Sequence, residues 1–419
     1  MIKGITDCGM QYAVRKSGSA VGYCALSIRC GTRDENGYHN GIAHFVEHTL
    51  FKGTEKRSAA VINSYLDKLG GELNAYTTKE EIVIHATVLK EDLGKASDLL
   101  MELVTSATFP EHEINTEKGV VIDEIQSYKD SPSEDIYDRF EEMLFKGHPL
   151  SGNILGTAAS VRKISREELL MFVRDKFLPC RMAFTVVADI DEGKMEKDIR
   201  KLTDKYFSNH SYPECHSTDE PGKTLGCTNL SIPAAVPFDR TLNKRNHQAN
   251  CIIGGLAPSL YQERERIATV LLCNILGGPA TNSILNSILR EKNGWVYAVE
   301  CGYTQFSDTG LVAITLGCDK NNLEKCLNAI HKEIRRLQNE PLSDRRLKAA
   351  KKQLLGQLAI SSDNGETQCL SMGKGLLAYG KVSSGKENRE LIESVTSEDI
   401  RDMAVRIFDP SRLSRLTYI

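Results

Sequence analysis

The sequence predicts an α+β protein of two tandem homologous domains, each a mixed, mostly antiparallel sheet with helices packed on it. Three observations support this fold class. Segments with strand and helix periodicity alternate over about the first 190 residues. A set of residues from the first half recurs at a fixed distance in the second half. A stretch rich in turn-forming residues separates the two halves.

The first half begins with two segments of low charge that are joined by a Ser-Gly-Ser turn. Ser58 is a candidate N-cap for the second helix, and Pro110 precedes the long fourth helix. Periodicity and end signals predict strands over 10–18, 21–31, 72–78, 81–88 and 182–188, and helices over 41–51, 59–69, 92–105, 111–129 and 165–177. Helices and strands therefore share one domain.

The second half repeats residues of the first at an offset of 231 positions. The recurring residues are Phe177, Pro179 and Arg181, which reappear as Phe408, Pro410 and Arg412. Pro110 matches Pro341 at the same offset. Because a fixed offset over separated segments indicates an internal duplication, we predict a first domain over 1–207, a linker over 208–232 and a homologous domain over 233–419.

Composition excludes several classes of protein. A net charge of −3 over 419 residues gives no basic field for nucleic acid or an anionic membrane. No apolar run reaches the length of a membrane span, and no apolar export signal begins the chain, so we expect a cytoplasmic protein without membrane contact. The 12 cysteines form no C-x-x-C pair. They are expected to be small buried residues of a reducing compartment, with a disulfide framework as the alternative.

The stretch His44-Phe45-Val46-Glu47-His48 carries the clearest chemical pattern. On a helix, positions four apart lie on one face, so the two imidazoles can share one metal ion. Glu47 lies nearly on the same face and can reach a water molecule at that metal. This is the H-x-x-E-H order of one class of zinc peptidases. The alternative is a surface helix that carries two histidines and a glutamate by chance.

A catalytic zinc needs a third protein ligand. Glu117 and Glu124 are candidates, because they lie seven residues apart and so on one face of the long predicted helix. From spacing alone, a solvated helix face explains both glutamates equally well. The equivalent positions of the second half, near 274–279 and at Leu354-Leu355, carry no histidine or glutamate. A metal site is therefore expected in the first domain and not in the second.

The segment 41–54 closely resembles the zinc helix of the pitrilysin and mitochondrial-processing-peptidase family, the inverzincins. In that family a glutamate about 76 residues after the second histidine is the third ligand, and another glutamate precedes it by seven. Glu124 and Glu117 stand at these positions. The resemblance implies that His44, His48 and Glu124 bind one Zn²⁺ per chain. It also implies that Glu47 is the general base and that Glu117 orients a ligand.

Two further segments resemble parts of the family that contact the peptide substrate. Leu73-Asn74-Ala75-Tyr76-Thr77 resembles a strand along which an extended peptide pairs, which implies that Asn74 and Ala75 bind substrate. An ordinary strand after a Gly-Gly turn is the alternative.

The second segment is 289–299, in which Arg290 and Tyr297 stand seven apart, as in the family's substrate-contacting pair. The resemblance implies that both touch the peptide and that Tyr297 donates to the oxyanion. A helix end with a solvated arginine is the alternative. The sequence departs from the family pattern at Thr49 and over 277–281.

The resemblance covers both halves and implies a zinc-dependent endopeptidase of oligopeptides or unfolded segments, enclosed in a clamshell chamber. It further implies a homodimer, in which the first domain of one subunit faces the second domain of the other. Arg290 and Tyr297 would then act in trans. Two alternatives are a non-catalytic scaffold subunit and a processing peptidase that requires an unlike partner.

Overall fold

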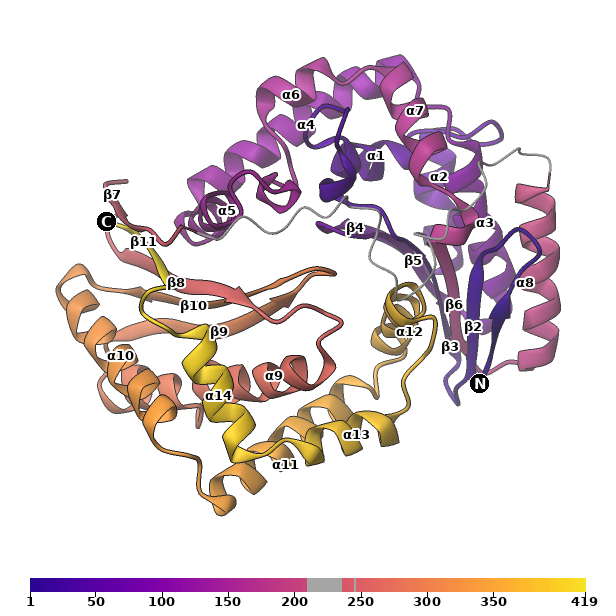
Figure 1. Cartoon of the computed structure of the whole chain (residues 1–419). Coiled ribbons are helices and arrows are strands. Elements are labelled where there is room, and N and C mark those ends of the chain that lie inside the picture. Colours follow the sequence, from indigo (N-terminus) through magenta and orange to yellow (C-terminus); the bar gives the residue numbers. More distant parts are fainter. Residues whose placement is uncertain (209–235, 245) are drawn as a thin grey trace. The chain divides into compact units, whose positions relative to one another are not determined.

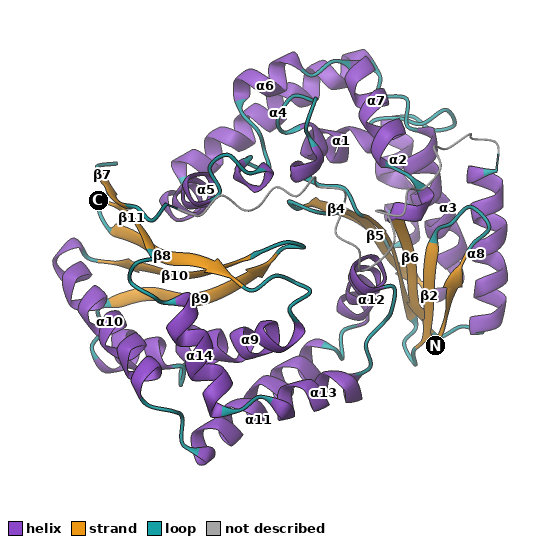
Figure 2. Cartoon of the chain, in the orientation of Figure 1, coloured by secondary structure: helices purple, strands orange, loops and turns teal. Residues whose placement is uncertain are grey.

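The computed structural model describes residues 1–208, 236–244 and 246–419, which form two compact units, each built on one sheet (Figures 1 and 2). Of the described residues, the first unit contains 1–126, 152–208 and 360–383. The second unit contains the rest. The predicted linker, 208–232, lies outside the described residues except for Ser208.

The first unit contains a six-stranded sheet in the order β1-β2-β6-β3-β5-β4. The pair β2–β6 is parallel and every other neighbouring pair is antiparallel. Its strands are β1 (Ile2–Ile5), β2 (Gln11–Lys16), β3 (Val21–Ile28), β4 (Glu72–Thr77), β5 (Ile82–Leu89) and β6 (Met182–Ala188). The order leaves β4 at an edge of the sheet.

The helices of the first unit cover this sheet and bury apolar residues against it. Phe45, Leu100 and Phe172 are fully buried in the resulting core, together with Leu26 and Phe184 of the sheet. The helices are α1 (Ile42–Leu50), α2 (Ala59–Tyr65), α3 (Leu93–Ser106), α4 (Glu111–Asp130, whose last turn belongs to the second unit), α6 (Ala158–Lys163), α7 (Arg166–Lys176), α8 (Glu192–Phe207) and α12 (Gly365–Tyr379).

The predicted strands and helices of the first half are all present, with ends shifted by a few residues. The helix predicted over 59–69 is shorter, because α2 ends at Tyr65 and the chain continues as a 3₁₀ turn, Asp67–Leu69. Ser58 precedes α2, but its side chain makes no capping hydrogen bond. The short strand β1, the helix Pro132–Leu144 and the helices α6 and α8 were not predicted.

The second unit contains a five-stranded sheet in the order β7-β11-β8-β10-β9. Its pair β7–β11 is parallel and its other pairs are antiparallel. The strands are β7 (Asp239–Leu242), β8 (Ala249–Ala257), β9 (Val296–Gln305), β10 (Gly310–Cys318) and β11 (Ser414–Tyr418). This arrangement repeats β2-β6-β3-β5-β4 of the first sheet strand by strand. The prediction of two homologous α+β folds is therefore confirmed.

The helices of the second unit come from both sequence halves. They are α5 (Pro132–Leu144), α9 (Glu263–Gly277), a helical segment (Asn286–Lys292), α10 (Leu323–Asn339), α11 (Asp344–Ser361), α13 (Gly385–Ser394) and α14 (Ser397–Ile407). Buried leucines and isoleucines of α9, α10 and α14 pack with β8, β9 and β10 in one core.

Two equivalent helices are exchanged between the sequence halves. Helix α5 comes from the first half, but its Phe140 packs with Ile252 and Leu311 of the second sheet. Helix α12 comes from the second half, but its Leu376 packs with Val83 of the first sheet (Figure 1). The compact units therefore interleave along the chain, and the domain boundaries at 207 and 233 stay a prediction about the sequence.

The described cysteines are mostly buried thiols, as expected. Nine are free, and all of these except Cys8 are buried. Cys180 departs from the expectation because it is disulfide-bonded. Within the described part of the chain, no helix combines the length and apolar composition needed to cross a membrane.

Candidate metal centre

Helix α1 holds the predicted metal-binding face in a fixed place. Its apolar residues, among them Phe45 and Val46, are fully buried in the core of the first unit. The buried Glu35 accepts hydrogen bonds from the backbone N–H groups of Gly41, at 2.9 Å, and Ala43, at 3.0 Å. These bonds satisfy donors that a helix start leaves unpaired. Burial raises the pKa of Glu35 to about 8.

The structure brings the three predicted ligands together. Nε2 of His48 lies 3.4 Å from Oε2 of Glu124, and Nε2 of His44 lies 3.8 Å from the same oxygen. One ligand atom from each of the three residues lies within 4.8 Å of the other two. Tetrahedral ligands at about 2.1 Å from a zinc ion are roughly 3.4 Å apart. The donor set and its spacing therefore fit zinc, and it is the sole such group among the described residues.

The two imidazoles differ in the direction of their pKa shifts, and therefore in how readily a proton competes with a metal ion. Burial, with a smaller effect of His48, lowers the pKa of His44 to about 3, so this ring is neutral near pH 7. Burial also acts to lower the pKa of His48, but the hydrogen bond with Glu117 and nearby carboxylates raise it overall. A proton therefore competes with a metal at His48 and not at His44.

Glu117 sits behind His48 and is almost completely buried. Its Oε1 lies 2.9 Å from Nδ1 of His48, and its Oε2 lies 2.6 Å from Nζ of Lys52. Burial acts to raise the pKa of Glu117, but the hydrogen bonds from His48 and Lys52 outweigh it and lower the pKa. An ionised Glu117 accepts the Nδ1 proton of His48 and so leaves Nε2 free to bind a metal.

Glu47 lies on α1 between the two histidines, and the structure shows what holds it. The hydroxyl of Thr77 donates a hydrogen bond of 2.7 Å to Oε2 of Glu47. Burial raises the pKa of Glu47. A carboxylate beside the ligand group, held by one donor, is placed to accept a proton from a water molecule there.

Asn74 and Ala75 lie on β4, the edge strand that packs against α1. Asn74 is opposite His85 of β5, and Ala75 is opposite Ile84. Among the described residues β4 pairs with β5 alone, so no described strand occupies its second edge. Their role in substrate binding stays a prediction.

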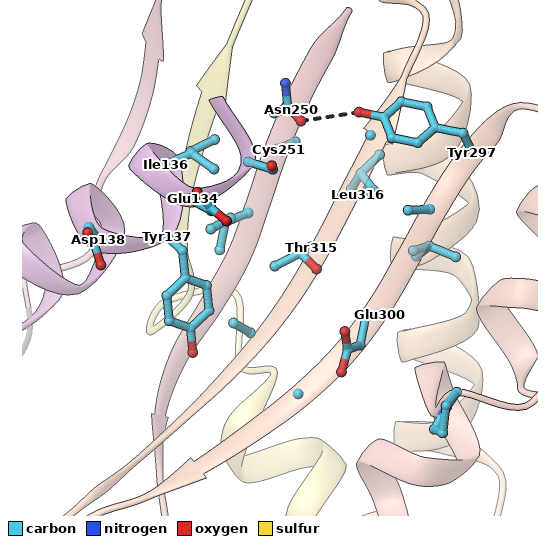
Figure 3. A pocket seen from close by; sticks show the side chains of 18 of the residues that line it. Glu134, Ile136, Tyr137, Asp138, Asn250, Cys251, Tyr297, Glu300, Thr315 and Leu316 are labelled. Atoms are coloured by element: carbon cyan, nitrogen blue, oxygen red, sulfur yellow. Dashed lines mark hydrogen bonds between the residues drawn. The ribbon is translucent and has the colours of Figure 1, made fainter. Parts of the chain in front are cut away.

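Arg290 and Tyr297 belong to the second unit, where both line a cavity of about 930 Å³. The cavity lies between α5 and the strands β8, β9 and β10 (Figure 3). The hydroxyl of Tyr297 donates a hydrogen bond of 3.4 Å to Oδ1 of Asn250. Tyr137 of α5 and Glu300 of β9 also line the cavity and lie on either side of Thr315 in Figure 3.

Two residues of the site were missed from the sequence. Lys52 stands four residues after His48, just beyond the end of α1 at Leu50, and this spacing could have suggested a partner for a buried carboxylate. Thr77 is the last residue of the strand that resembles the family's substrate strand. Its approach to Glu47 depends on how α1 packs on β4, and spacing along the chain carries no signal for that contact.

Comparison with known proteins gives two family matches. Residues 12–158 match the family described as Insulinase (Peptidase family M16), and residues 163–354 match the Peptidase M16 inactive domain. The second description agrees with the location of the metal group, since all three of its residues precede 163.

Similar proteins cover nearly the whole chain. An uncharacterized zinc protease of Rickettsia bellii is 30% identical over 93% of this chain and 90% of its own. One from Bacillus subtilis is 29% identical over 91% of this chain and 89% of its own. The mitochondrial-processing peptidase subunit beta of Saccharomyces cerevisiae is 27% identical over 93% of this chain and 84% of its own.

Solved structures show the same fold. A protease from Helicobacter pylori aligns over 100% of this chain and 99% of its own, with a TM-score of 0.89 and 18% sequence identity. A peptidase M16 inactive domain from Pseudomonas fluorescens aligns over 100% and 97%, with a TM-score of 0.84 and 17% identity. The relatives confirm the resemblance to the pitrilysin and mitochondrial-processing-peptidase group, and the chain belongs to the insulinase family of metalloproteases, peptidase family M16.

Proposed function

We propose that the protein is a zinc-dependent endopeptidase that hydrolyses peptide bonds in oligopeptides or unfolded polypeptide segments. The observation that carries the proposal is the convergence of His44, His48 and Glu124, with Glu47 beside them on α1. Two imidazoles and one carboxylate are the ligands of a hydrolytic zinc that keeps a position for water.

The residues of α1 and α4 take the following roles. When bound, one zinc ion per chain would lower the pKa of a water molecule and polarise the carbonyl of the peptide bond. Glu47 accepts a proton from the attacking water and then delivers it to the departing amine. Glu117 keeps the Nδ1 proton on His48 throughout, so that Nε2 stays a metal ligand.

The peptide is proposed to pair with the second edge of β4 in an extended conformation. Backbone hydrogen bonds along an edge strand bind peptides of many sequences, which suits unfolded segments. Asn74 and Ala75 provide this strand. Arg290 and Tyr297 are proposed to contact the same peptide, with Tyr297 donating to the oxyanion and Arg290 holding the backbone or the same charge.

We further propose that a homodimer completes the site in a clamshell chamber. The ligand group belongs to the first unit, and Arg290 and Tyr297 belong to the second. A chain with both sets of residues can complete two sites by pairing with a copy of itself. The yeast relative is called a subunit, so a processing peptidase with an unlike partner is the alternative. A cytoplasmic location is also kept as a proposal.

The decisive experiment measures zinc content and cleavage of a library of quenched fluorescent peptides, with and without a chelator. We expect about one zinc per chain, and cleavage that a chelator abolishes and added zinc restores. The variant Glu47→Gln should retain zinc and lose cleavage. Normal turnover in that variant would exclude Glu47 as the base. Absence of both zinc and cleavage would favour the non-catalytic scaffold.

A mixing experiment tests the dimer. Chains with Arg290→Ala and chains with Glu47→Gln are each expected to be inactive. When the two kinds of chain are mixed and allowed to exchange subunits, mixed dimers form. If Arg290 acts in trans, one of the two sites in a mixed dimer then contains both Glu47 and Arg290. Lack of recovery in a mixture that is shown to contain mixed dimers would argue against action in trans.

A further inference from the structure

The carboxylate of Glu47 is tied to the sheet through Thr77. Oγ1 of Thr77 lies 2.7 Å from Oε2 of Glu47. Within the described part of the chain, this is the one side-chain hydrogen bond that the Glu47 carboxylate accepts. Oε1 of Glu47 is left for another partner.

The hydroxyl of Thr77 is itself held in a fixed place. Thr77 is the last residue of β4 and lies opposite Ile82 of β5. The backbone N–H of Thr78 donates to Glu81 at 2.8 Å, and the hydroxyl of Thr78 accepts from the N–H of Glu81 at 3.0 Å. These bonds close the turn directly after Thr77. A donor held by such a turn needs little reorganisation to keep its contact.

A second segment supports this turn from outside. The N–H of Thr32 donates to the carbonyl of Thr78 at 3.2 Å. A Cβ atom at Gly31 would lie 2.4 Å from the carbonyl carbon of Lys79, so the two backbones touch where only glycine fits. The position of Thr77 is therefore set by the strand, by the turn and by the contact with Gly31.

We propose that Thr77 is a positioning residue for the general base. Its hydrogen bond to Oε2 holds the Glu47 carboxylate in one orientation and leaves Oε1 to accept the proton of the attacking water. This proposal rests on the proposed function. Because alternate residues of a strand share one face, Thr77 lies on the face of β4 that also carries Ala75. The strand proposed to receive the peptide therefore also orients the base.

Three variants test the proposal. Thr77→Val removes the donor at nearly constant shape, and Thr77→Ser retains it. Loss of a hydrogen bond to a charged group is expected to lower the rate of the catalysed reaction roughly 10- to 100-fold. We expect kcat of Thr77→Val to fall by that factor while KM and zinc content stay unchanged. Thr77→Ser should recover most of the rate. Thr87→Val, on the neighbouring strand β5, is the matched control and should stay within about twofold of the unmodified protein.

A crystallographic measurement separates this proposal from the proposed function. In crystals of the zinc-loaded protein, the Glu47 carboxylate should keep one orientation in the unmodified protein and in Thr77→Ser, and should change or split in Thr77→Val. An unchanged orientation in Thr77→Val overturns the proposal, even if no peptide is cleaved by any form. A valine variant with unchanged kcat, or one whose loss tracks lost zinc or a raised KM, also overturns it.

Discussion

Oε1 of Glu117 lies 2.9 Å from Nδ1 of His48, and this contact decides which nitrogen of the ring faces the ligand group. Glu117 can accept a hydrogen bond only when Nδ1 carries the proton, so Nε2 keeps its lone pair. That Nε2 lies 3.4 Å from Glu124. The buried carboxylate is not a ligand, yet it sets the tautomer of one.

Removal of Glu117 should therefore weaken zinc binding. In Glu117→Ala the His48 ring loses its acceptor, and we expect zinc affinity to fall about 10- to 100-fold. Competition with a chromophoric chelator measures the affinity. Glu111→Ala, at an exposed position of the same helix, is the control and should bind zinc normally. Equal affinities for both variants would show that Glu117 does not orient His48.

Lys52 should act on zinc through Glu117 alone. Its Nζ lies 2.6 Å from Oε2 of Glu117, and its side chain is partly exposed. Lys52→Met keeps the apolar stem and removes the charge, so we expect zinc affinity to fall roughly fivefold or less. In the background of Glu117→Ala the same change should have no further effect, because the partner is gone. Additive losses in the double variant would mean that Lys52 acts by another route.

The sequence predicted the part of this site that depends on spacing within one helix. His44, Glu47 and His48 follow from the helical repeat, and Glu124 was assigned because its distance from His48 matches a known family. Lys52 was overlooked because a lysine near a helix end is usually solvated. Thr77 was overlooked because its contact joins a helix to a strand about 30 residues away, through packing that no local pattern encodes.

The pH dependence of zinc binding should identify His48 as the titrating ligand. Its pKa is raised above the ordinary 6.5, so the metal-free protein begins to take up this proton above pH 6.5. Below that pKa the apparent zinc affinity should fall about tenfold per pH unit for one competing proton. His44, with a pKa of about 3, adds no competition above pH 5. Chelator competition at a series of pH values measures the slope.

Two outcomes would contradict this assignment. A slope of two protons between pH 5 and 7 would mean that both histidines titrate in that range. An affinity that is constant from pH 8 to 5 would mean that the proton does not compete at His48. In Glu117→Ala the hydrogen bond that raises the pKa of His48 is absent. The onset of proton competition should therefore move to lower pH in that variant.

The exchange of α5 and α12 could not be predicted from the sequence. Helix α5 is amphipathic, and the buried positions of α12 recur at helical spacing, but neither pattern indicates which of the two sheets the helix covers. Which sheet it covers is decided by the complementarity of side chains that lie more than 100 residues away. Phe140 packs in one cluster with Leu416, and the backbone carbonyl of Cys369 accepts a hydrogen bond of 2.9 Å from the hydroxyl of Thr185.

The exchange predicts a stability effect that crosses the sequence halves. Phe140 is fully buried, so Phe140→Ala should cost about 3–5 kcal/mol. Hydrogen exchange followed by mass spectrometry should speed up in β8, β10 and β11, although Phe140 lies in the first half of the chain. Leu376→Ala should cost about 2–5 kcal/mol and speed up exchange in β2, β3 and β6 instead. Val405→Ala, at an exposed position of α14, is the control.

If Phe140→Ala affected the first sheet and left the second unchanged, α5 would not cover the sheet assigned to it. If both variants loosened both sheets equally, the two units would unfold as one cooperative body.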